Sequence, residues 1–353
     1  MTSEPAIKTK RRRTAGVPAG VITGEGPGTT SPKPSRQKSP SPASAPRKSV
    51  PQKSSQRPAP SPVSPPPVSA SPSVSHLIVT GVARSGTTAL AELLNSHARI
   101  CIGIERFKFR YLRENDYSAD LFRRERFFDF RPADTNLLPA VRPHWKPVYE
   151  LMEQKWDQAE VIGDKVPDLI PTLADFMAAN PGFRFICTLR NLKDVGLSWQ
   201  ARADKPRDSW PADKGFVQAC ESWAEQMRIL FTLLREQPDI RSRLLLLDYD
   251  QMYAPGNTTM AVIRGFLGIG PSKSFRRAFT RHEAFFSNRQ PSEVPAEHVN
   301  SYKAVDMTFA RGLRREARLM AERWSADPAL AGDLAAIRPQ PAVRDPQARN
   351  PQE

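Results

Sequence analysis

Two glycines, two threonines and an arginine near residue 85 have the types and spacing of an anion-binding loop. The stretch G-V-A-R-S-G-T-T (residues 81–88) has the spacing G-x-x-x-x-G between an apolar run and a helical pattern. Such a turn presents backbone N–H groups and the positive end of a helix dipole to an anion. Thr87 stands where a nucleoside-triphosphate loop carries lysine, and Arg84 supplies the cation instead. The loop therefore predicts a less charged ligand that needs no metal, and we predict no metal site.

A second candidate anion-binding group follows a later apolar run. In L-R-N-L-K-D-V-G-L-S-W-Q, Arg190 ends the run and Ser198 comes eight residues later, two turns into a helical pattern. If this strand ends beside the first loop, Arg190 and Ser198 are placed to bind a second phosphate.

Short apolar runs alternate with helical patterns from residue 76, which is typical of β–α units around a parallel sheet. The runs predict strands at residues 76–81, 100–105, 183–189 and 243–249. The last of these is almost continuously apolar, as a strand covered on both faces should be. We therefore predict an α/β, P-loop-like three-layer fold with a central parallel sheet flanked by helices.

Composition divides the chain into three parts. Residues 1–75 contain 16 of the 35 prolines, no aromatic residue, and 12 Lys and Arg against two Glu. Such a segment cannot bury enough surface to offset the entropy of ordering. We predict a disordered basic tail at 1–75, a folded domain at 76–334 and a disordered tail at 335–353. Within the domain, residues 105–160 are rich in Arg, aromatics and proline, which is typical of a loop or short-helix insertion that carries substrate specificity.

Charge and cysteine content limit the function classes. The first tail carries +10 of the formal +15, so the remaining chain is only +5, which argues against a nucleic-acid-binding domain. The run K-T-K-R-R-R (residues 8–13) is either a solvated arm or a contact for an anionic polymer or membrane surface. The first thirty residues lack the apolar stretch of an export signal, and three cysteines without CxxC pairing suit a reducing compartment. We expect a soluble, cytoplasmic protein.

These motifs resemble those of sulfotransferases that use 3′-phosphoadenosine 5′-phosphosulfate (PAPS). The resemblance rests on R-S-G-T-T after one strand and R-x7-S after a later one, and extends over about residues 76–290 through G-D-K-V-P and R-L-L-L-L-D-Y-D-Q-M. It implies a sulfotransferase-type fold, PAPS as co-substrate, and a hydroxyl-bearing acceptor that is a glycan, a lipid, a small molecule or a peptide tyrosine. Ala83, Val166 and Asp250 depart from the usual residues of the family, which leaves the subfamily and the acceptor open.

The same resemblance implies which residues hold the donor and which react. The implied donor contacts are Arg84, Ser85, Gly86, Thr87 and Thr88 on the 5′ side, Arg190 and Ser198 on the 3′-phosphate, and Tyr249 at the adenine. Lys165 is implied as the cation on the bridging oxygen, and Arg84 shares that charge. Glu105 is implied as the base, because it lies at the same distance after the loop arginine as the catalytic glutamate of tyrosylprotein sulfotransferases.

Structural roles compete with these assignments. Glu105 is otherwise a surface carboxylate paired with Arg106 or Lys108. Lys165 is otherwise a surface lysine that caps or pairs with Asp164 or Asp168, but the flanking G-D and V-P predict a defined turn, which opposes that role. Three ring side chains are expected to pack or cap rather than react: His97, Trp199 and Trp223.

Two further function classes also stay in competition. A P-loop kinase or ATPase predicts magnesium-dependent nucleotide turnover, which the missing loop lysine opposes. A non-enzymatic binder of anionic polymers predicts that the basic tail alone carries the interaction.

Overall fold

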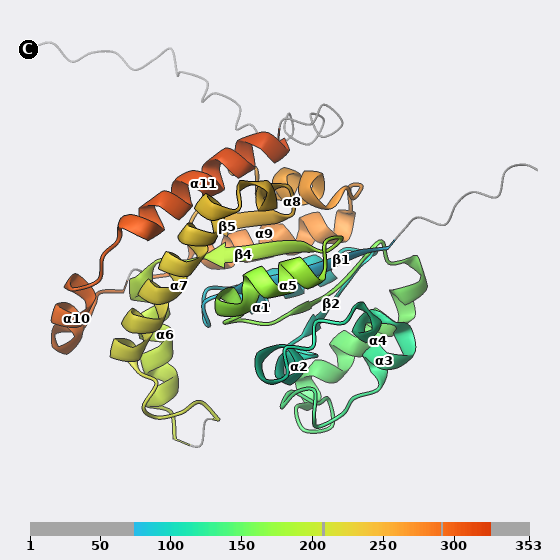
Figure 1. Ribbon diagram of the computed structural model, residues 1–353, viewed down its shortest axis with the longest axis horizontal. Helices are drawn as coiled ribbons and strands as arrows, with labels where there is room; N and C mark the ends of the chain where they lie inside the picture. Colours follow the sequence, from blue (N-terminus) through green and yellow to red (C-terminus); the bar gives the residue numbers. More distant parts are fainter. Residues whose placement is uncertain (1–73, 207–208, 291, 326–353) are drawn as a thin grey trace, which may run out of the picture. The chain divides into compact units, whose positions relative to one another are not determined.

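In the part of the chain that the structure describes, a parallel sheet of five strands organises the fold (Figure 1). The computed structural model describes residues 74–206, 209–290 and 292–325. The strands are β1 (Ser75–Gly81), β2 (Ile100–Ile104), β3 (Val161–Lys165), β4 (Arg184–Leu189) and β5 (Leu244–Asp248). Apart from residues 74 and 75, the predicted tail at 1–75 lies outside the described residues, as does the one at 335–353. The folded domain predicted to reach residue 334 is described as far as residue 325.

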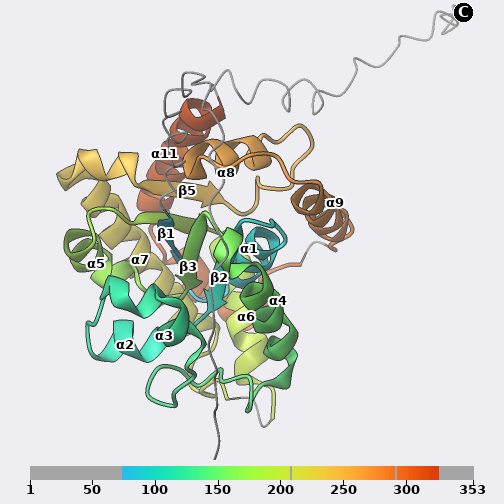
Figure 2. The same cartoon turned by 90° about the vertical axis from the view of Figure 1, so that its right-hand side faces the viewer.

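Helices connect the strands and cover the sheet. They are α1 (Thr87–Asn95), α2 (Lys108–Arg113), α3 (Arg124–Phe128), α4 (Lys146–Lys155), α5 (Leu173–Ala179), α6 (Leu192–Ala203), α7 (Phe216–Glu236), α8 (Thr259–Leu267), α9 (Lys273–Ser287), α10 (Val299–Lys303) and α11 (Thr308–Ser325). Figure 2 shows α1, α4 and α9 on one face of the sheet and α5, α7 and α11 on the other, which confirms the three-layer prediction. None of the described helices is both long and apolar enough to cross a lipid bilayer.

The strand order β2-β3-β1-β4-β5 places β1 at the centre. All four pairings are parallel, so the carboxyl ends of the five strands share one edge of the sheet. The chain leaves β1 for β2 on one side and reaches β4 on the other, so the order switches beside the loop that follows β1. In open α/β sheets, ligands bind at such a switch point, outside the carboxyl ends of the strands.

The sheet confirms four predicted strands to within a residue or so and adds one that the sequence interpretation missed. Residues 163–165 were expected to lie in a turn, but they belong to β3, which pairs with both β1 and β2. Gly163 lies so close to β1 that an added Cβ would be 1.8 Å from the Leu77 carbonyl oxygen. The G-D part of the turn prediction was therefore wrong, because a glycine needed for close strand approach was taken for a chain reversal, whereas a turn does follow β3 at residues 167–168.

Candidate active site

Every strand of the sheet contributes to one group of side chains at the carboxyl edge. Glu105 follows β2, Lys165 ends β3, the glycine loop follows β1, Arg190 follows β4 and Tyr249 follows β5. The parallel topology thus gathers residues from 81 to 249 at one place, although no two of these groups are neighbours in sequence.

The loop after β1 forms a tight turn that leads into α1. Arg84 and Gly86 both have a positive φ, of 73° and 98°, so the chain turns twice in the left-handed region before the helix begins at Thr87. Gly86 is required here, because a Cβ would lie 2.3 Å from ring carbons of Tyr249. The first N–H groups of α1 have no partner within the helix, so the turn presents them as an anion-binding cradle.

Hydrogen bonds with side chains of other segments hold the backbone of the loop in place. Asp168, itself in the left-handed region at φ 61°, accepts from the Ala83 N–H at 2.8 Å and from Gln226 Nε2 at 3.1 Å. The indole N–H of Trp199 donates to the Ala83 carbonyl. The expected packing role of Trp199 is therefore what the structure shows, and the side chain braces the loop.

The second motif meets the first one directly. Arg190 Nη1 donates to the Arg84 carbonyl oxygen at 3.0 Å, and Arg84 Nε donates to Ser198 Oγ at 2.9 Å. Trp223 in turn donates its indole N–H to the Arg190 carbonyl. Residues more than 100 positions apart are thus interlocked, as the sequence interpretation required.

Arg190 also lies over an aromatic ring. Its guanidinium carbon is 5.1 Å from the centroid of the Tyr249 ring, which packs against Gly86 on the loop. No described residue accepts a hydrogen bond from the buried Nε–H of Arg190. A buried donor of this kind is costly unless a ligand satisfies it.

Glu105 lies between two lysines. Its Oε1 is 2.9 Å from Lys165 Nζ and its Oε2 is 2.8 Å from Lys108 Nζ. Only 14% of the Glu105 side chain and 2% of the Lys165 side chain are exposed. Burial alone raises the pKa of the Glu105 carboxyl, but the two ammonium groups outweigh it and the net pKa lies below its usual range. The carboxylate is therefore ionised near neutral pH, as a general base must be, although the two ion pairs reduce its proton affinity.

The backbone around Glu105 is held in an unusual conformation. Glu105 has a φ of 52°, and its N–H donates to the Lys165 carbonyl oxygen at 2.7 Å. The Asp164 carboxylate accepts from the N–H groups of Arg106 and Phe107, and burial raises the pKa of Asp164 to about 7. The turn after β2 is thus fixed to β3, which orients the carboxylate toward Lys165.

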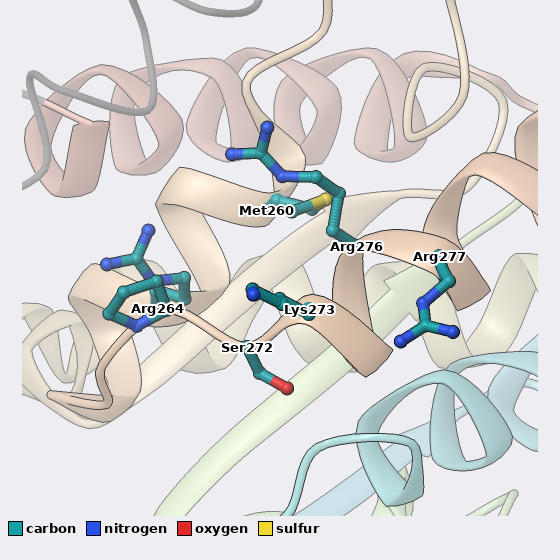
Figure 3. Close-up of a pocket in the computed structure, with 7 residues that line it drawn as sticks. Met260, Arg264, Ser272, Lys273, Arg276 and Arg277 are labelled. Carbon is teal, nitrogen blue, oxygen red and sulfur yellow. The ribbon is translucent and has the colours of Figure 1, made fainter.

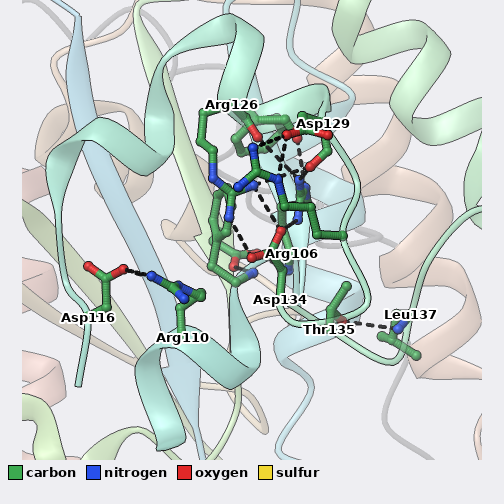
Figure 4. A network of polar contacts seen from close by, with 12 residues as sticks. Arg106, Arg110, Asp116, Arg126, Asp129, Asp134, Thr135 and Leu137 are labelled. Atoms are coloured by element: carbon green, nitrogen blue, oxygen red, sulfur yellow. Dashed lines mark hydrogen bonds and ion pairs between the residues drawn. The ribbon is translucent and has the colours of Figure 1, made fainter. Parts of the chain in front are cut away.

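Arg106 does not pair with Glu105, so that part of the competing interpretation is wrong. Figure 4 shows the Arg106 guanidinium turned into the insertion, where Nη1 contacts Asp134 Oδ2 at 2.8 Å. It also donates to the carbonyl oxygens of Phe127 and Asp129. Both side chains of the pair are essentially unexposed, and Arg126 adds a second cation on Asp134. This network anchors the segment 105–160, whose predicted short helices are α2, α3 and α4.

Two charged residues near Arg190 escaped the sequence interpretation. Asp194 lies in the first turn of α6, and its carboxylate lies 3.4 Å from Arg190 Nη2 and 2.8 Å from Arg289 Nη1. Arg289 follows α9, so the cluster joins a third chain segment to the two motifs. The only signal in the sequence was an acidic residue four positions after Arg190, which is a frequent helix pattern and therefore uninformative.

Ser85 and His97 have structural partners. The Ser85 hydroxyl is buried and 2.6 Å from Thr188 Oγ1, while its N–H donates to the Val82 carbonyl. His97 accepts from the Arg99 N–H through Nδ1 and contacts the Gly270 carbonyl through Nε2, so it caps and packs as expected. Burial of His97 lowers its pKa.

A model of the sulfotransferase family matches residues 76–272, which is more than half of the chain. No curated protein sequence matches the chain.

Three solved sulfotransferase structures are similar to this chain at low identity. STF9 from Mycobacterium avium is 14% identical over 69% of this chain and 77% of its own, with a TM-score of 0.41. STF1 from Mycobacterium tuberculosis is 17% identical over 72% and 77%, with a TM-score of 0.39. Mouse SULT7A1, solved with 3′-phosphoadenosine 5′-phosphate (PAP), is 13% identical over 74% and 87%, with a TM-score of 0.36.

Proposed function

Because the chain belongs to the sulfotransferase family, we propose that it transfers a sulfonyl group from PAPS to a hydroxyl group of an acceptor. The observation that carries the proposal is the interlocking of two motifs. Arg190 donates a hydrogen bond to the Arg84 carbonyl oxygen, and the Arg84 side chain donates one to Ser198 Oγ. One nucleotide with phosphate at both ends of its ribose is the ligand that such a pair of anion sites fits.

Donor binding is assigned to both motifs. The N–H groups at Gly86, Thr87 and Thr88, with the side chain of Arg84, hold the 5′-phosphosulfate at the start of α1. Ser85 contributes through the shape of the loop, since its hydroxyl is bonded to Thr188. Arg190 and Ser198 hold the 3′-phosphate, and its oxygens satisfy the buried Nε–H of Arg190. Tyr249 lies between the loop and Arg190, where it supports the adenosine.

The transfer step needs a base and a cation at the leaving oxygen. The acceptor oxygen forms a bond to sulfur while the bond from sulfur to the bridging oxygen of the donor breaks. Glu105 takes the proton of the acceptor hydroxyl, and PAP leaves with the electron pair of the broken bond. Lys165 stabilises the negative charge that develops on that oxygen, with Arg84. Glu105 Oε1 and Lys165 Nζ lie 2.9 Å apart, so the base and the cation are adjacent at the same edge of the sheet.

The acceptor class stays a prediction. The insertion at 105–160 begins with Glu105 and continues into α2. We therefore propose that it determines whether the acceptor is a glycan, a lipid, a small molecule or a peptide tyrosine. A cytoplasmic location and a contact of the basic tail with an anionic polymer or membrane likewise stay predictions.

Calorimetric titration distinguishes this function from its rivals. We expect the full-length protein to bind PAP without added metal and more tightly than ATP with magnesium. Preference for magnesium ATP with turnover would favour a P-loop kinase or ATPase. A variant lacking residues 1–74 should still bind and turn over PAPS. If that variant instead loses binding to an anionic polymer and neither it nor the full chain binds PAPS, the tail-driven binder is favoured.

A further inference from the structure

A cavity of about 600 Å³ lies between α8 and α9, apart from the residues assigned to sulfonyl transfer. Figure 3 shows its lining, which comprises Met260, Arg264, Pro271, Ser272, Lys273, Arg276 and Arg277. Four of these seven residues are cationic, and no aspartate or glutamate of the described chain is among them. We call it the α8–α9 cavity.

The α8–α9 cavity is separated from the donor loop by the length of α1. The turn that enters α9 is anchored at Gly270, whose carbonyl oxygen lies 3.1 Å from His97 Nε2. His97 follows the carboxyl end of α1, whereas the donor loop precedes its amino end, and nine helical residues span about 13 Å. A ligand in the cavity therefore does not share the groups that hold the donor.

Four positively charged side chains line the α8–α9 cavity, and two of them, Lys273 and Arg277, lie four residues apart on one face of α9. Arg264 is only 5% exposed, and both its burial and the nearby charge of Arg276 lower its pKa. In Figure 3 the ammonium group of Lys273 extends from the first turn of α9 toward Arg264. Arg264 and Arg276 also have other interactions, so the inference rests on Lys273 and Arg277, which have no ion pair within the described residues.

The volume of the cavity fits a ligand larger than an inorganic ion. Its volume is within the range of small-molecule sites, which is roughly 300–1,000 Å³, and an inorganic phosphate would occupy a small part of it. Met260 and Pro271 supply apolar wall, to which the aliphatic stems of the cations add. The start of α9 adds the positive end of a 15-residue helix.

We propose that the α8–α9 cavity binds an organic phosphate monoester, with the phosphate held by Lys273 and Arg277 and the organic group against Met260 and Pro271. Two negative charges match the concentration of cations better than a singly charged ligand would. The lining residues of this site include none of those assigned to the transfer reaction, and its occupant contacts α9 rather than the donor loop.

Isothermal titration with phenyl phosphate tests the proposal on the full-length protein, with PAP present throughout to fill the donor site. We expect saturable binding that is at least about 10-fold weaker in the double variant Lys273→Gln/Arg277→Gln. The matched control is Arg281→Gln/Arg235→Gln, which removes the same charge from α9 and α7 outside the cavity and should bind like the wild type. Inorganic phosphate should bind more weakly than phenyl phosphate.

Three results would overturn the site. Wild-type protein that shows no saturable heat up to about 10 mM phenyl phosphate has no such site. Equal weakening in the cavity and control variants would mean that the ligand is attracted diffusely to the basic surface. Equal affinity for inorganic and phenyl phosphate would show that the organic group does not contribute to binding. Because each comparison is between variants, the result does not depend on whether PAPS is the donor. Thermal unfolding checks that both double variants are folded.

Discussion

On the β2–β3 side of the candidate site one carboxylate lies between two lysines, and on the β4 side another carboxylate lies between two arginines. Glu105 contacts Lys165 and Lys108, whereas Asp194 contacts Arg190 and Arg289. Both carboxyl groups have a pKa below the usual value, because neighbouring cations and hydrogen bonds outweigh the effect of burial. The charge pattern is the same in both places.

The proposed roles of the two carboxylates are opposite. In the proposal Glu105 takes the proton while Lys165 stabilises the leaving oxygen, whereas on the β4 side Arg190 binds the 3′-phosphate and Asp194 competes with that phosphate for the guanidinium. The comparison teaches that a charge triad does not by itself identify the reacting group. Removal of the two carboxylates should therefore change different quantities, in opposite directions.

The largest effect is expected from Glu105→Gln. Loss of a general base lowers the transfer rate by about 10² to 10⁴, while the neutral amide keeps the shape of the side chain. The rate is measured by PAP release with an acceptor found for the wild type, and PAP affinity by calorimetry. Affinity should stay close to that of the wild type. A variant with full activity would remove Glu105 from the reaction.

Arg190→Ala should weaken PAP binding by about 10- to 100-fold, because charge-assisted hydrogen bonds to phosphate are lost. Arg228, an exposed arginine of α7 paired with Glu225, offers a control of the same kind, and Arg228→Ala should bind like the wild type. If both variants bind PAP equally well, the assignment of the 3′-phosphate to Arg190 is wrong.

Asp194→Asn should tighten PAP binding by about 3- to 10-fold, since the bound phosphate no longer competes with a carboxylate for Arg190 and Arg289. The amide can still accept from Asn191 Nδ2 at the start of α6. Weaker binding in a variant that unfolds at the wild-type temperature would show that Asp194 orients the arginines rather than competing for them.

Lys108→Met is expected to have the smallest effect, and to show it through pH. Lys108 helps to lower the pKa of Glu105, so its removal raises that pKa. Because the base must be ionised, the acid limb of the rate profile should move to higher pH, with the rate on the plateau little changed. An unchanged acid limb with a lower plateau would mean that Lys108 contacts the substrate directly.

The sequence predicted that the glycine loop, Arg190 and Ser198 lie close together, because each motif is local. The glycine loop, Arg190 and Ser198 are each read from a strand followed by a helix, and the parallel topology brings them together. The strand β3 could not be predicted in this way. Its residues include Gly163 and Asp164, which are unfavourable in an isolated strand. Glycine is needed at 163 because the Leu77 backbone leaves no room for a Cβ, and Asp164 is needed because its carboxylate accepts hydrogen bonds from two N–H groups of the next turn.

The contacts of Asp194 could not be predicted from the sequence, whereas the pairing of Lys108 with Glu105 was one of the two alternatives that the sequence offered. Asp194 is a charged residue one helical turn or so from a motif residue, a spacing that occurs on most solvated helices. What distinguishes it is contact with a second segment, that of Arg289. Such contacts depend on tertiary packing, which no local pattern contains.

The left-handed backbone at Arg84 decides how this residue should be probed. Its carbonyl is the acceptor for Arg190, so the conformation at φ 73° links the two anion sites through the main chain as well as through the guanidinium. Alanine would remove the side chain and also disfavour that conformation, whereas glycine adopts it readily. Arg84→Gly therefore isolates the contribution of the charge, and the difference between the glycine and alanine variants measures how far the loop itself is pre-shaped for its ligand.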